Sequence, residues 1–211
     1  MTIDHLARKA PNDGDQDVTG LAGIDGVGQM SDADLVREYR RDPDRFTAVY
    51  DRYFGDVHRY VAGRLDTQVA DDIAAETFLV AFRKRDRFDP ARGALRPWLF
   101  GIATRLVAQH RRVESRHYET LARATPAPAD HGHENQVVTA VTAAGLQPQL
   151  AHAIAALTRK ERDVLLLVAL ADFSHEEVAQ ALRIPYGTVG SRLNRARKKL
   201  RSALEKELPH G

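Results

Sequence analysis

Residues 182–201 read LRIPYGTVGSRLNRARKKLR and form the most informative segment of this 211-residue chain. Pro185 and Gly187 mark a short turn near the start of the segment. Beyond the turn, apolar residues spaced three and four apart form one stripe on a helical wheel. The stripe comprises Val189, Leu193, Ala196, Leu200 and Leu204. Because residues 183–201 also contain seven bases and no acid, we predict a helix that packs by one face and exposes cations on the other.

The face opposite this stripe has small and polar residues near the start of the helix and bases further along. Small residues allow a helix to lie deep in the major groove of DNA, Asn and Arg read base edges, and Lys neutralises phosphate. The residues on this face are Gly187, Ser191, Asn194, Arg195 and Lys198. The alternative is a solvated cationic surface, which a run of charge alone usually indicates.

Two capping boxes precede the basic helix. Residues 158–161 (TRKE) and 174–177 (SHEE) each place a Ser or Thr three residues before a Glu, the pattern in which two side chains satisfy each other's backbone amides. A capped helix, a tight turn and a second, strongly basic helix together predict a helix-turn-helix. A stand-alone helix-turn-helix regulator would explain residues 150–208 and would bind as a dimer, but it leaves residues 31–116 without a role.

Charge is unevenly distributed along the chain. The whole chain has 31 bases and 29 acids, a net charge of +2. The first 34 residues hold seven acids and two bases, which leaves 29 bases and 22 acids, a net charge of +7, in the remainder. A basic body behind an acidic leader suggests a polyanionic partner.

Composition excludes several classes of protein. The chain has no cysteine, which rules out a disulfide scaffold, thiol catalysis, iron–sulfur clusters and Cys-based zinc fingers. No apolar run approaches the ~20 residues of a membrane span, and residues 1–28 lack the apolar stretch of a signal peptide, so we expect a cytoplasmic protein with no membrane contact. We find no Ser-His-Asp set in a credible context, no phosphate-binding Gly loop and no metal-ligand cluster, so we expect no enzyme activity, cofactor or metal.

Hydrophobic periodicity divides the chain into four parts. Residues 1–30 have five Gly, many Asp and no periodic pattern, which predicts a disordered acidic leader. Residues 31–116 and 149–208 have helical spacing with no alternating strand pattern. Residues 117–148 are rich in Ala, Pro and His and predict a flexible linker. We therefore expect an all-α chain of two small helical domains, a helical bundle and a helix-turn-helix, which move independently.

Three segments resemble a known family. Residues 182–201 resemble region 4.2 of sigma factors, residues 72–82 (DIAAETFLVAF) resemble region 2.2, and residues 96–105 (RPWLFGIATR) resemble the signature of regions 2.3 and 2.4. Their order and spacing are similar to those of the extracytoplasmic-function (ECF) group of the sigma-70 family, which keeps regions 2 and 4 alone. The resemblance covers roughly residues 31–116 and 149–205. Four residues depart from the family pattern, namely Ala75, Arg105, Gln109 and Gly190.

The resemblance implies an alternative sigma factor that binds core RNA polymerase and directs promoter-specific transcription initiation. Region 4 would read the −35 element as duplex, and region 2 would capture the −10 element as a separated strand. The implied partners are core RNA polymerase, through the clamp helices of its largest subunit and its flap region, promoter DNA and, as in other family members, an anti-sigma factor. The expected −35 contacts are Gly187, Thr188, Ser191, Arg192, Asn194, Arg195 and Lys198.

The expected contacts of region 2 fall into two groups. A single-strand reader needs stacking surfaces beside cations, and the expected −10 contacts are Phe88, Arg92, Arg96, Trp98, Arg105, Arg111 and Arg112. For Trp98 the alternative is core packing. Asp72 and Glu76 share one helix face with Asp71 beside them, and we expect all three to bind polymerase. An ordinary solvated acidic face is the alternative.

Overall fold

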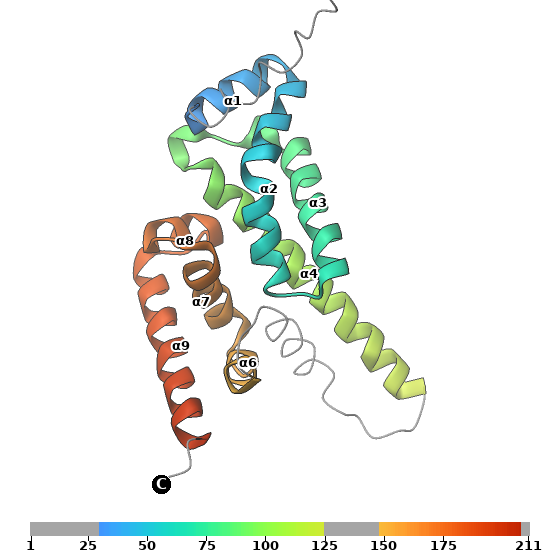
Figure 1. Cartoon of the computed structure of the whole chain (residues 1–211), viewed down its shortest axis with the longest axis vertical. Helices are drawn as coiled ribbons and strands as arrows, with labels where there is room; N and C mark the ends of the chain where they lie inside the picture. The colour runs from blue at the N-terminus through green and yellow to red at the C-terminus, as the bar shows by residue number, and fades with distance from the viewer. Residues whose placement is uncertain (1–29, 125–147, 208–211) are drawn as a thin grey trace, which may run out of the picture. The chain divides into compact units, whose positions relative to one another are not determined.

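The computed structural model describes residues 30–124 and 148–207, with the exception of the side chains of residues 118–124 and 206–207. All regular elements of this part are helical, which confirms the predicted all-α class (Figure 1). The α-helices are α1 Asp32–Arg41, α2 Thr47–Ala62, α3 Thr67–Arg83, α4 Leu95–Ala124, α6 Pro148–Ala155, α7 Arg159–Ala171, α8 His175–Leu182 and α9 Tyr186–Glu207. Short 3-10 turns lie at Pro43–Phe46, Arg85–Arg87 and Pro90–Arg92.

Side-chain caps fix where several of these helices begin. The Ser31 side chain accepts a hydrogen bond from the amide of Asp34 at the start of α1, and Asp66 does the same for α3. Both predicted capping boxes form, at the starts of α7 and α8. At their other ends these two helices stop at Asp172 and Arg183, which have left-handed backbone conformations with φ of 51° and 53°.

The N-terminal helices form a bundle around a core of apolar and aromatic residues. α2 and α3 lie side by side and α4 packs against both (Figure 1). The fully buried residues of this bundle include Tyr39, Val49, Val57, Tyr60 and Leu99. α4 continues to Ala124, past the predicted end near Arg116. The predicted leader, residues 1–30, lies almost wholly outside the described residues, as do residues 125–147 of the predicted linker.

The C-terminal helices form the predicted helix-turn-helix. α9 packs against α6, α7 and α8. It does so through the predicted stripe, because Val189, Leu193 and Ala196 are buried and Leu200 and Leu204 are half-buried. Within the described residues, no helix is long and apolar enough to cross a membrane.

The two helix groups also pack against each other. α8 lies on α4, and α7 lies on α2. The backbones come close at Gly101 of α4, where an added Cβ would lie 2.4 Å from the carbonyl oxygen of Ala181. This packing was not predicted from the sequence, which indicated two halves that move independently. The meeting surfaces come from distant segments, and each one by itself reads as an ordinary amphipathic helix.

Candidate nucleic-acid interface

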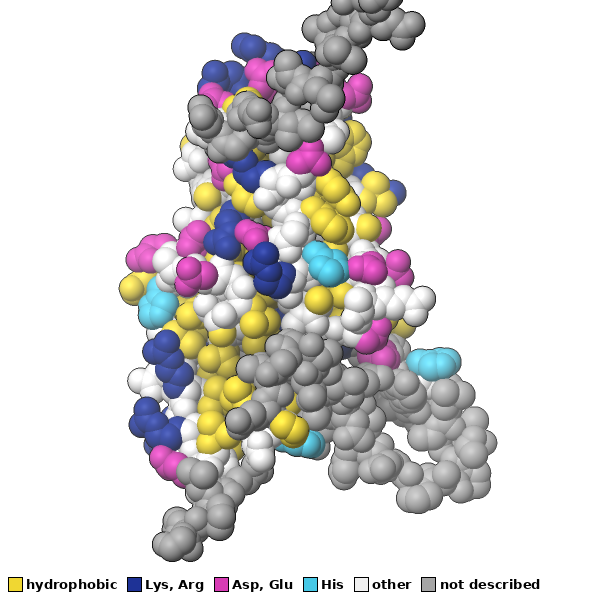
Figure 2. All heavy atoms as spheres, in the orientation of Figure 1, with side chains coloured by type: hydrophobic (Ala, Val, Ile, Leu, Met, Phe, Trp, Pro, Cys, Tyr) yellow, Lys and Arg dark blue, Asp and Glu magenta, His cyan; other side chains and the backbone are white. Residues whose placement is uncertain are grey.

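The basic surface of the helix-turn-helix lies along α9. Lys and Arg side chains gather there in the space-filling view (Figure 2). Of the predicted −35 residues, Gly187, Ser191, Asn194, Arg195 and Lys198 are exposed, and Thr188 and Arg192 are half-buried. A Cβ added at Gly187 would meet nothing within 4 Å, so the start of the helix is open to close approach by a ligand backbone.

Internal hydrogen bonds orient part of this face. The Arg195 Nε donates to the carbonyl of Ser191 at 3.3 Å, and the Ser191 hydroxyl donates to the carbonyl of Thr188 at 3.1 Å. Tyr186, at the first position of α9, is 56% exposed, and its ring lies 5.7 Å from that of His175. Tyr186 was not among the predicted contacts. Its position in the Pro-Tyr-Gly turn is the sequence signal that could have identified it.

One base of α9 has a structural role. The Lys199 ammonium donates to Glu161 Oε2 at 2.8 Å, and Glu161 also closes the capping box of α7. The bond from Lys199, followed by those from Thr158, lowers the pKa of Glu161 although burial acts in the opposite direction. The pair therefore ties α9 to the start of α7.

The predicted −10 residues occupy different environments. Arg92, Arg105 and Arg112 are exposed, and Trp98 is half-buried. Phe88 is only 5% exposed, and its ring packs on Trp98 with centroids 5.0 Å apart. The Phe88 carbonyl accepts a hydrogen bond from Arg40 at 2.6 Å. Phe88 thus holds its loop in place by packing in the interior, and its ring is not exposed for stacking on a base.

A cavity of about 440 Å³ opens between the loop after Phe88 and helix α8. Its lining includes Arg87, Arg92, Trp98, Gln180 and Arg183. Cations beside an aromatic ring suit a nucleotide, because the ring can stack on a base while a guanidinium binds phosphate. Three of the predicted −10 residues, Phe88, Arg92 and Trp98, therefore line this cavity.

Two further predicted −10 residues are engaged inside the protein. Arg96 donates to the carbonyl of Ala171 at 2.6 Å, and its guanidinium lies 4.6 Å from the centre of the Phe173 ring. Arg111 donates to the carbonyl of Arg64. Burial, followed by the positive charges of Arg64 and Arg162, lowers the pKa of Arg111 to about 9.

The three predicted polymerase-binding acids lie together on α3. Asp71 and Asp72 are exposed and Glu76 is half-buried. Asp71 lies 2.7 Å from His58 Nε2 on the neighbouring helix α2. The same two helices carry Tyr50 and Leu79, which are exposed hydrophobic residues. These two residues were not among the predicted contacts.

Two family models match the chain. The model described as "Sigma-70 region 2" matches residues 49–117, and the model described as "Sigma-70, region 4" matches residues 148–200. The chain is 38% identical over 148 residues to the probable RNA polymerase sigma-C factor of Mycobacterium bovis, which covers 69% of this chain and 75% of that protein. It is 29% identical over 170 residues to the ECF RNA polymerase sigma factor SigW of Bacillus subtilis, which covers 77% and 90%.

Two solved structures share the fold. One is CnrH in complex with the cytosolic domain of CnrY, with a TM-score of 0.59, 22% identity and coverage of 84% of this chain and 99% of that chain. The other is the sigma factor RpoE in complex with the anti-sigma factor NepR from Bartonella quintana. Its TM-score is 0.52, with 20% identity and coverage of 77% and 98%.

The Glu161–Lys199 pair generates a pH-dependent prediction. Glu161→Gln preserves the capping-box pattern but removes the charge that pairs with Lys199. Because folding lowers the pKa of Glu161, the pair stabilises the fold at pH values above the ordinary pKa of Glu. That stabilisation is lost as the pH falls through the lowered pKa. We expect Glu161→Gln to lower the free energy of unfolding by about 1 kcal/mol near pH 7 and by much less in acid, at a pH well below the ordinary pKa of Glu. Urea unfolding at both pH values measures this, and an equal loss at both would contradict it.

Proposed function

We propose how this chain contacts its promoter, since it belongs to the ECF sigma factors of the sigma-70 family and is an alternative sigma factor that directs promoter-specific transcription initiation. In this proposal two separate surfaces contact the promoter. Helix α9 reads the −35 element as duplex, through Gly187 to Lys198. The loop and helix of residues 88–112 capture the −10 strand. The observation that carries this proposal is the division of α9 into a buried apolar stripe and an exposed polar and basic face.

Energetics favour a protein that opens DNA only together with a larger partner. At about 1.4 kcal/mol per stacking step, separating ~10 steps of duplex costs about 14 kcal/mol. Stacking a flipped base on an aromatic ring returns only ~1–3 kcal/mol. Core RNA polymerase, which binds the bubble and the downstream duplex, supplies the remainder in this proposal.

The polymerase contacts follow from charge and exposure. We propose that Asp71, Asp72 and Glu76 of α3 face the clamp helices of the largest subunit, and that the C-terminal helices face the flap region. An anti-sigma factor is a further proposed partner, because the similar RpoE structure holds the anti-sigma factor NepR. Sigma factors act in transcription initiation without catalysing a reaction of their own, and we place this one in the cytoplasm, where core polymerase works.

Run-off transcription tests the proposed function directly. Core polymerase of the host bacterium is incubated with the full chain and sheared genomic DNA, and the transcript ends are mapped. We expect a defined set of start sites that depends on the chain and shares two elements, at −35 and −10. Start sites that are the same with and without the chain would contradict the proposal.

Two substitutions on α9 separate base reading from phosphate binding. We expect Arg195→Ala to cost ~1–3 kcal/mol in binding the mapped −35 duplex and to relax preference at one base pair, because Arg reads a base edge. Lys198→Ala should weaken binding to all DNA sequences alike. It should also reduce the slope of log affinity against log salt concentration by about one. Fluorescence anisotropy with matched and mutated duplexes at several salt concentrations measures both effects. Equal, sequence-independent losses would make the helix an electrostatic anchor only.

Charge reversal on α3 tests the polymerase contact. The double substitution of Asp72 and Glu76 by Lys should weaken co-purification with core polymerase by at least about tenfold, since it places repulsive charge in a complementary interface. The matched control reverses Asp44 and Asp86, two exposed acids outside α3. Retention of polymerase by the α3 variant at the level of the control would contradict this assignment.

A further inference from the structure

The cavity beside the loop after Phe88 has walls from two segments that lie far apart in the sequence. One wall is formed by the loop of residues 87–94 and by Trp98 in the first turn of α4. The other is formed by the end of α8 and the residues that follow it, namely Ala179, Gln180, Arg183 and Ile184. Its volume of about 440 Å³ falls within the range of ~300–1,000 Å³ that is typical of small-molecule sites. The cavity is therefore large enough for one small ligand.

Positive charge dominates the lining of this cavity. The described residues of the lining include three arginines, Arg87, Arg92 and Arg183, all exposed, and a single carboxylate, that of Asp89. Asp89 is already engaged, because it accepts a hydrogen bond from the Ala91 amide at 3.0 Å and lies 3.7 Å from Arg92 Nε. Neither Arg87 nor Arg183 forms an ion pair within the described part of the chain. The cavity therefore has an excess of positive charge that favours an anion.

Arg183 is held at the cavity by its backbone and lies near a further cation. It ends α8 in a left-handed conformation with φ of 53°, and its amide donates to the Gln180 carbonyl at 3.3 Å. Burial and, after it, the charge of Arg183 lower the pKa of Arg105 on α4. An anion bound by Arg183 would offset this repulsion between the two guanidiniums.

An aromatic ring and an amide complete the lining. Trp98 is half-buried, and the Phe88 ring packs against it with centroids 5.0 Å apart. Gln180 Oε1 accepts a hydrogen bond from the Ala94 amide at 3.4 Å, which leaves the amide nitrogen of Gln180 to donate to a ligand. Ile184 adds an apolar surface. An indole that can stack on a base, an amide donor and several guanidiniums together suit a nucleotide.

Two features favour a free nucleotide over a nucleotide within a DNA strand. A strand continues on both sides of a captured base, but here the loop is joined to α8 by the hydrogen bond between Ala94 and Gln180. Beside it, a Cβ added at Gly93 would lie only 3.0 Å from Gln180 Oε1. A strand also brings one phosphate charge per nucleotide, whereas the cavity presents three arginines. A single nucleoside with several phosphates matches that charge better.

We propose that this cavity is a binding site for a free nucleoside polyphosphate, with the base on Trp98 and the phosphates on the three arginines. The site goes beyond the proposed function, because binding of the nucleotide requires neither polymerase nor DNA. One consequence rests on the proposed function: Arg92 and Trp98 are also proposed −10 contacts, so a bound nucleotide and the promoter strand exclude each other. Capture of the promoter strand would then respond to the concentration of the nucleotide.

The fluorescence of Trp98 reports on the cavity directly, because it is the only tryptophan of the chain. GTP and ATP are titrated into the full chain without polymerase, DNA or divalent cations. Free N-acetyltryptophanamide controls for absorption of light by the nucleotide. We expect saturable quenching as the base stacks on the indole. Guanosine, and tripolyphosphate measured by its displacement of GTP, should bind at least about tenfold more weakly than GTP, because each lacks one half of the ligand.

Two substitutions remove one cation from either wall of the cavity. These are Arg183→Gln and Arg87→Gln, both at exposed positions. The matched controls are Arg201→Gln on α9 and Arg41→Gln on α1, which remove the same charge from exposed positions that do not line the cavity. We expect each cavity variant to raise the half-saturating concentration of GTP at least about fivefold, with both controls like the parent chain.

Four results would overturn the inference. The first is the absence of saturable quenching by both nucleotides. The second is an equal loss of binding in the cavity variants and the controls, which would indicate attraction by net charge alone. The third is binding of tripolyphosphate as tight as that of GTP, which would make the cavity a simple anion site. The fourth is tighter quenching by a short single-stranded DNA with the same dependence on Arg183 and Arg87, which would assign the cavity to the promoter strand.

Failure of the nucleotide site and failure of the proposed function give different results. The titrations contain no polymerase, so the absence of nucleotide binding would leave chain-dependent start sites in run-off transcription unchanged. The absence of those start sites, with saturable and arginine-dependent quenching retained, would contradict only the proposed function.

Discussion

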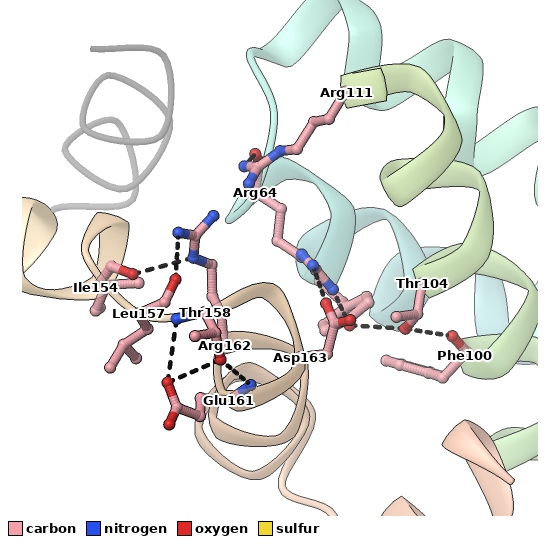
Figure 3. A network of polar contacts seen from close by, with 11 residues as sticks. Arg64, Phe100, Thr104, Arg111, Ile154, Leu157, Thr158, Glu161, Arg162 and Asp163 are labelled. Carbon is pink, nitrogen blue, oxygen red and sulfur yellow. Dashed lines mark hydrogen bonds and ion pairs between the residues drawn. The ribbon is translucent and has the colours of Figure 1, made fainter. Parts of the chain in front are cut away.

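Arg64 is a nearly buried cation whose counter-charge lies 99 residues further along the chain. Burying a guanidinium at this depth is costly without a paired carboxylate, and Asp163 of α7 supplies that carboxylate where α7 meets the end of α2 (Figure 3). Once they meet, α8 is brought onto α4, and this approach is possible because Gly101 presents no side chain to the Ala181 carbonyl. The positions of Arg96, Arg111 and Phe173 are consequences of the same contact.

This constraint sorts the many cations of the chain into two kinds. Arg64, Arg162 and Lys199 bind carboxylates or backbone carbonyls and so hold the fold together. Arg195 and Lys198 project from α9 into solvent and remain available to DNA. Arg96 belongs to both kinds, because the guanidinium proposed to bind a strand donates to Ala171 of the neighbouring helix group. Arg111 is instead held within its own helix group by the carbonyl of Arg64. A basic net charge alone would not distinguish these roles.

The helices of region 4 and the family membership were predictable because their signals are local. A capping box needs only four consecutive residues, and the stripe from Val189 to Leu204 depends only on 3.6-residue periodicity. Both are found in the structure where the sequence placed them. The order of the sigma-like segments is likewise a property of the linear chain, and the family models match the same segments.

Other features depend on which distant surfaces meet, and no local pattern encodes that. Phe88 was predicted as a stacking surface, yet it is buried because Trp98 and Arg40 lie beside it in three dimensions. Lys199 reads as one base among seven until Glu161 is found 2.8 Å away. The contact between the two helix groups is a further feature of this kind: residues on both sides follow ordinary helical periodicity, and only their packing reveals that a buried charge pair and a glycine contact join them. Local backbone preference and hydrophobic spacing thus specify the helices, whereas the packing and charge pairing of distant segments decide which of their faces are exposed.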